Sequence, residues 1–124
     1  MEPLQALDTI FLAAPTSSDQ RLQKILEVSR GFVYLVARTG VTGSQSDVEA
    51  SVPKTVERLR RYTQLPIAVG FGITSAQDVS KVWQYADAAV VGSAIVRFIE
   101  EHRSEADLAG KVGEYVRKNL ISAP

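Results

Sequence analysis

Two groups of small residues are the features of this sequence best suited to chemistry. Gly70-Phe71-Gly72 ends one apolar run, and Gly92-Ser93 ends the next. Glycine at the end of a strand lets a ligand approach the backbone, and the free N–H groups of a following helix can hold an anion. A Gly-x-Gly also occurs in plain tight turns, and Ser93 is equally suited to be an N-cap. The two groups together favour phosphate binding by the backbone.

Apolar runs alternate with amphipathic patterns along the chain. The expected strands are 9–14, 32–36, 65–69 and 88–91. This alternation indicates an α/β fold with a parallel sheet, either an open doubly wound sheet or half of a (β/α)8 barrel; the pattern alone does not choose between them. In such barrels the loops after strands seven and eight often form the phosphate site.

The capping residues predict where the helices begin. Ser17 or Ser18 begins the first, and Ser75 forms a capping box with Asp78 for a helix that buries Val79, Val82 and Trp83. The other expected helices begin at Ser51 and Pro53, run from Ser93 to Glu101, and run from Ala106 to Leu120.

One long connection interrupts this alternation. Residues 39–50 are small and polar and predict the least ordered internal segment, either a lid over a site or a plain connection. Arg58, Arg60 and Arg61 indicate a solvated basic face, and His102 a solvated residue near a helix C-terminus.

Composition limits the possible functions. The 124 residues suffice for a single domain, residues 1–124, and the net charge is zero, which gives no electrostatic footprint for nucleic acid or an anionic membrane. The chain has no cysteine and one histidine, so thiolate and multi-histidine metal sites are excluded. It shows neither an apolar run of spanning length nor a signal peptide, so the expected location is cytoplasmic.

Four successive segments resemble the tryptophan synthase alpha subunit family. Residues 31–43 (GFVYLVARTGVTG) resemble its sixth strand and mobile sixth loop, 66–74 its seventh strand and 89–96 its eighth. Residues 8–16 are similar to its fifth strand. The order and spacing of all four match, which is far more specific than a glycine pair. The resemblance therefore implies a parallel (β/α)4 half of a TIM-type (β/α)8 barrel.

The resemblance also implies a reaction and a set of site residues. The family cleaves indole-3-glycerol phosphate to indole and glyceraldehyde 3-phosphate and passes indole to a beta subunit, which holds the pyridoxal phosphate; the alpha subunit itself needs no cofactor or metal. Residues at the substrate-phosphate positions are Gly43, Gly72, Gly92 and Ser93. Residues at positions adjacent to the substrate are Tyr34, Arg38, Thr42, Gly70 and Phe71.

The catalytic pair of that family is not matched here. A glutamate on its second strand and an aspartate on its second loop perform the acid–base chemistry, and both precede its fifth strand, just before which this sequence begins. Neither Asp8 nor Asp47 is suited to these roles, so we expect no catalytic residue in this chain and no activity from it alone.

Two other interpretations stay open from the sequence. One is a non-catalytic half-barrel that forms a homo-oligomer through its open sheet edges. The other is a different phosphate-binding barrel, such as an indole-glycerol-phosphate synthase or a phosphosugar epimerase. The loop Arg38–Gly43 argues against this second interpretation.

Overall fold

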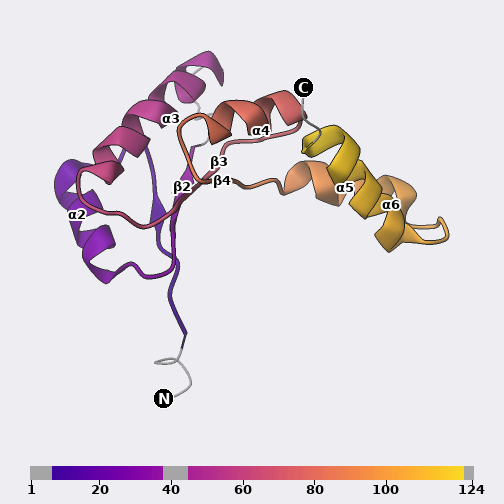
Figure 1. Ribbon diagram of the computed structural model, residues 1–124, viewed down its shortest axis with the longest axis horizontal. Helices are drawn as coiled ribbons and strands as arrows, with labels where there is room; N and C mark the ends of the chain where they lie inside the picture. Colours follow the sequence, from indigo (N-terminus) through magenta and orange to yellow (C-terminus); the bar gives the residue numbers. More distant parts are fainter. Residues whose placement is uncertain (1–6, 38–44, 122–124) are drawn as a thin grey trace.

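A computed structural model describes residues 7–37 and 45–121 of the chain (Figure 1). Its centre is a four-stranded sheet in which every neighbouring pair is parallel and the strand order follows the sequence. The strands are β1 (Leu12–Ala13), β2 (Val33–Val36), β3 (Ile67–Gly70) and β4 (Ala88–Ala89). Each falls inside, or within one residue of, a predicted apolar run. The α/β prediction is confirmed.

The helices alternate with the strands and then continue beyond the sheet. They are α2 (Asp19–Val28), α3 (Gln45–Arg60), α4 (Ala76–Trp83), α5 (Ser93–His102), α6 (Leu108–Tyr115) and the π-helical turn η1 (Val116–Leu120). Figure 1 shows α2, α3 and α4 following one another along the sheet, whereas α5 and α6 lie side by side beyond α4. In the described part of the chain, no helix is long and apolar enough to cross a membrane.

The two faces of the sheet differ in burial because successive side chains of a strand point to opposite sides. On β2, Val33 and Leu35 are fully buried and Tyr34 and Val36 are only half-buried. Leu12, which pairs with Tyr34, is 61% exposed. We call the side with Val33 and Leu35 the helix-covered face and the other the open face.

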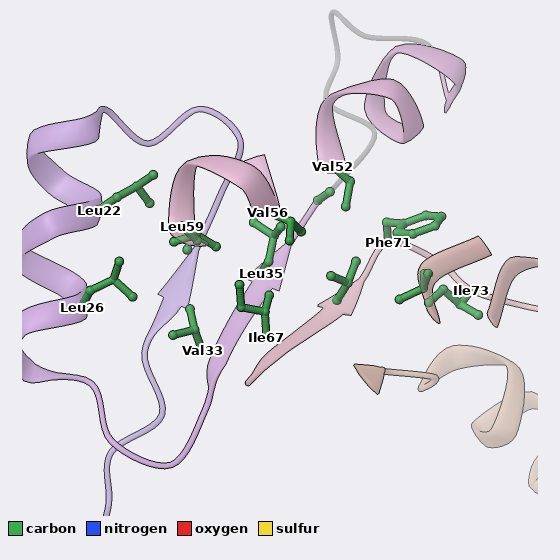
Figure 2. Packing of buried hydrophobic residues seen from close by; sticks show 14 of the residues in the cluster. Leu22, Leu26, Val33, Leu35, Val52, Val56, Leu59, Ile67, Phe71 and Ile73 are labelled. Carbon is green, nitrogen blue, oxygen red and sulfur yellow. The ribbon is translucent and has the colours of Figure 1, made fainter. Parts of the chain in front are cut away.

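The hydrophobic core lies between the helix-covered face and the helices (Figure 2). Leu22 and Leu26 project from α2 toward the strands, and Val56 and Leu59 project from α3. The predicted apolar positions of these helices are therefore the ones that the core uses.

Two predicted helix starts are confirmed in detail. Ser18 is the N-cap of α2, and its hydroxyl accepts a hydrogen bond from the Arg21 N–H. Ser75 caps α4 by accepting from the Asp78 N–H at 3.2 Å. The Asp78 carboxylate accepts in return from the Thr74 N–H at 3.1 Å, one residue before the cap, so it also holds the end of the β3–α4 loop.

The predicted start of the third helix is wrong. Pro53 favours the first turn of a helix, but α3 begins at Gln45 and carries Pro53 inside it. Residues 45–50 of the expected loop are therefore helical, and the remainder lies outside the described residues. Val52, Val56 and Leu59 are buried as their spacing predicts, and this apolar stripe holds α3 to the sheet despite the proline.

Two predictions about the exposure of side chains also need correction. Trp83, predicted to lie in the core, ends α4 with 52% of its surface exposed. The basic run is not merely solvated, because the Arg58 guanidinium donates to Asp19 and to the carbonyl oxygens of Pro15 and Ser17 at 2.6–3.3 Å. These bonds fasten α3 to the loop that precedes α2.

His102 and its neighbours hold α5 against α6. The rings of His102 and Phe98 stack at 3.9 Å between centroids, and Phe98 stacks on Tyr115 of α6 at 4.5 Å. The half-buried His102 ring is therefore packed, whereas the sequence predicts a freely solvated one. The Lys111 ammonium also donates to the Glu105 carboxylate at 2.9 Å across the turn between the two helices.

Asp87 joins three elements at the amino end of the sheet. Its carboxylate accepts from the N–H of Ile67, the first residue of β3, at 2.9 Å and from the Arg60 guanidinium at 2.6 Å. The backbone N–H of Asp87 donates to the Ile67 carbonyl. The hydrogen bond from the Ile67 N–H, followed by that from Arg60, lowers the Asp87 pKa below its ordinary value of 3.8.

Acidification should weaken the fold through Asp87. The pKa of Asp87 is lower in the folded state than its ordinary value of 3.8. The stabilisation from Asp87 is therefore fully present above pH 3.8 and is lost as the pH falls through the folded-state pKa. Urea unfolding of the wild type and of Asp87→Asn at several pH values measures this. The difference in unfolding free energy should be largest near neutral pH and shrink below 3.8. An equal difference at every pH would contradict the assignment.

Candidate phosphate site

The two predicted glycine sites follow adjacent strands at the same edge of the sheet. β3 and β4 are parallel neighbours, and their register pairs Val69 with Ala89. The pairing continues past that point, because the Val90 N–H donates to the Val69 carbonyl at 2.8 Å. Gly72 and Gly92 each lie three positions beyond the Val69–Ala89 pair. The register therefore brings both loops to the carboxyl edge, where parallel α/β proteins bind ligands.

The backbone conformation at position 72 favours glycine. Its φ is +76°, in the left-handed region that favours glycine, and an added Cβ would meet nothing within 4 Å. The turn after β3 thus has an exposed backbone with open space above it. A ligand atom could approach there without displacing a side chain.

The N-terminus of α5 has donors to offer. Gly92 is its N-cap and provides no side-chain cap. The N–H groups of Ile95 and Val96 donate to the Gly92 carbonyl at 3.0 and 3.1 Å, whereas those of Ser93 and Ala94 have no acceptor among the described residues. Two free N–H groups at the positive end of a helix dipole favour an anion.

Gly92 has no steric reason to be glycine. Its φ is −118°, which other residues adopt, and an added Cβ would meet nothing within 4 Å. At α4, by contrast, the Ser75 hydroxyl already occupies the Asp78 N–H. The start of α4 therefore carries a side-chain cap, whereas the start of α5 carries none.

Gly70 serves a different purpose. A Cβ at this position would lie 2.9 Å from the Tyr34 Oη and 3.4 Å from the Val90 Cβ. The missing side chain therefore makes room for the Tyr34 ring, which lies across the carboxyl end of β3 on the open face. The sequence did not predict this contact, because Tyr34 and Gly70 belong to different strands.

The remaining predicted site residues add little to the candidate site. The Phe71 side chain is 9% exposed and packs in the core (Figure 2), so only its backbone is available at the strand end. Arg38, Thr42 and Gly43 lie outside the described residues. Among the side chains that the structure describes, those of residues 7–37 and 49–121, no three His, Asp or Glu gather to hold a metal ion.

The fold defines a parallel βα protein, and its candidate anion site lies at the carboxyl edge of the sheet. A sequence model of the family "Tryptophan synthase alpha chain" matches residues 4–121. The chain is 46% identical over 112 residues to the tryptophan synthase alpha chain of Solibacter usitatus, covering 90% of this chain and 42% of that protein. It is 44% identical to the one from Methanocaldococcus jannaschii, covering 80% and 35%.

Solved structures agree with these relatives. The tryptophan synthase alpha subunit of Campylobacter jejuni superposes with a TM-score of 0.74 at 35% identity, covering 88% of this chain and 43% of that one. A tryptophan synthase a2b2 complex from Pyrococcus furiosus gives 0.71 at 31% identity, covering 94% and 45%. The chain belongs to the tryptophan synthase alpha chain family and spans less than half the length of these relatives, with the fold of half a (β/α)8 barrel.

Proposed function

We propose that this chain supplies the substrate-phosphate half of a lyase that cleaves indole-3-glycerol phosphate to indole and glyceraldehyde 3-phosphate in tryptophan biosynthesis. Family membership supports the reaction. The observation that carries the phosphate role is the uncapped start of α5, where Gly92 leaves open space above two free N–H groups.

The proposed site acts by holding the substrate. The N–H groups of Ser93 and Ala94, with the exposed turn at Gly72, donate to phosphate oxygens and fix one end of the molecule. Binding energy from this remote group orients the bond that breaks. The general acid that protonates the indole ring and the base that accepts the glycerol proton come from elsewhere in the barrel. The site needs no cofactor or metal for this task.

Phosphate should bind at the three residues Gly72, Gly92 and Ser93. Titration of the 15N-labelled chain with inorganic phosphate should shift their backbone amide resonances together. Gly92→Ala places a methyl group in the open space and should weaken binding about tenfold, the cost of roughly one charge-assisted hydrogen bond.

Gly113→Ala is the matched control, since an added Cβ there also meets nothing within 4 Å but lies on α6. It should leave the affinity unchanged. Shifts confined to another patch, or equal weakening by both substitutions, would overturn the assignment.

A tryptophan synthase beta subunit is the proposed protein partner. The Pyrococcus furiosus relative is described as part of an a2b2 complex. We extend this partnership to the barrel that contains this half, since indole released by the lyase step is the molecule that the beta subunit uses.

Self-association is the second interaction that we propose for the chain. In the described sheet, β1 and β4 are the edge strands, so each has one side unpaired. Unpaired backbone groups are costly to bury, and the open face beside them exposes Leu12. A second copy would satisfy both edges at once.

Light scattering at micromolar concentration should therefore detect a dimer or larger species. Leu12→Glu on the open face should shift the population toward monomer. Val28→Glu tests an equally exposed apolar residue on α2, 58% exposed against 61% for Leu12, and should leave the assembly intact. A well-folded wild-type monomer would contradict this proposal.

A further inference from the structure

The two loops of the proposed phosphate site precede different helices. Gly72 leads into α4, and Gly92 caps α5. The main contacts of α5 are with α6, which continues directly into η1, and η1 in turn contacts α4 (Figure 1). The β3–β4 register sets the spacing between the two loops, and the contact of η1 with α4 is a second link between the helices that follow them.

Leu120 is the buried residue of this turn. It ends η1 and is 2% exposed, whereas the next residue, Ile121, is 50% exposed. The Ile121 N–H donates to the Val116 carbonyl at 3.0 Å, five residues back, as in a π-helix. One extra residue in the turn rotates the subsequent residues by about 100° relative to an α-helix, and such turns are rare enough to indicate a specific need.

We propose that Leu120 is a positioning residue for the phosphate site: its burial in η1, the element that contacts α4, holds the N-terminus of α5 in its orientation beside the turn at Gly72. This inference rests on the proposed phosphate-binding function. In this proposal Leu120 acts indirectly, through α6 and α5, which are joined by the stacked rings of Tyr115 and Phe98.

The physical basis is a difference between local and global stability. The core of buried side chains gathers residues of α2, α3, α4 and the sheet and includes none from α5, α6 or η1. Truncating Leu120 therefore weakens the attachment of the α5–α6 pair more than it weakens the core. When only a fraction of molecules holds α5 in place, the apparent dissociation constant rises by the inverse of that fraction.

Leu120→Ala in the full chain tests the proposal, with inorganic phosphate as the probe and the Ser93 and Gly72 amide shifts as the readout. The apparent dissociation constant should rise about tenfold, as for a competent fraction of one tenth. Leu120→Met should restore most of the affinity because it refills the volume. Ile121→Ala, beside it but exposed, should change nothing.

Hydrogen exchange separates positioning from general destabilisation. In Leu120→Ala, amides of α5 and α6 should exchange faster while those of β2 and α3 keep their wild-type rates. Unchanged phosphate affinity, or uniformly faster exchange, would overturn the proposal. If Leu120→Ala does not fold, Leu120→Val is judged by the same criteria. A wild type that binds no phosphate at these amides would refute the proposed function itself, whereas equal binding by wild type and variant would refute only the role of Leu120.

Discussion

A polypeptide of these 124 residues should release no indole from indole-3-glycerol phosphate above the uncatalysed rate. The described residues that we propose for phosphate binding are glycines and Ser93, and none of them carries a carboxylate for proton transfer. General acid–base catalysis typically contributes about 10²–10⁴-fold, and here the acid and the base would both be missing. An assay of indole release at high enzyme concentration measures this.

Co-expression with strands one to four of a family member should restore turnover. The matched control is the same partner half with its second-strand glutamate changed to glutamine. This variant should assemble equally well and show no turnover. Turnover by the 124-residue polypeptide alone, abolished by a point substitution within it, would show that the proton-transfer groups lie in this chain.

Leu35→Ala should be among the most destabilising single substitutions in the sheet. Leu35 is 0% exposed at the centre of the helix-covered face, and Figure 2 shows it among side chains from the neighbouring elements. Truncation of a buried leucine leaves a cavity and costs about 2–5 kcal/mol, a large share of the stability of a small domain. Chemical unfolding measures the loss.

Val36→Ala provides the comparison on the open face of the same strand. Val36 is half-buried, and its truncation should cost less, about 1 kcal/mol or below. If self-association covers the open face, the cost of Val36→Ala rises with protein concentration whereas that of Leu35→Ala changes less. A larger cost for Val36→Ala at every concentration would contradict the assignment of the two faces.

The strands and the core were predictable because burial imposes a simple pattern on the sequence. Continuous apolar runs marked the parallel strands, and the spacing of Val52, Val56 and Leu59 marked the buried side of α3. The start of that helix was not predictable from Pro53, since the apolar stripe outweighs the single hydrogen bond that a proline removes. The local preference of proline for the first turn therefore failed to predict the start of α3, because the packing of the helix against the sheet determined its extent.

The glycine turns that form the candidate site were predictable, whereas their binding of phosphate stays a prediction. A glycine that ends a strand is visible in the sequence, and the positive φ of Gly72 agrees with it. Contacts between distant residues were not visible. Neither the fit of Tyr34 over Gly70 nor the three bonds of Arg58 could be inferred, because each depends on how separate elements meet.

The two ends of the sheet differ in what their residues do, because the hydrogen bonds of Asp87 lie at the amino end alone. Its bonds to Ile67 and Arg60 fasten the amino end, while the turns at Gly72 and Gly92 occupy the carboxyl end and take no part in that fastening. The carboxyl-end turns can therefore be exchanged while the amino end keeps the strands in register. For the proposed phosphate site, this means that ligand specificity can change separately from the stability of the sheet.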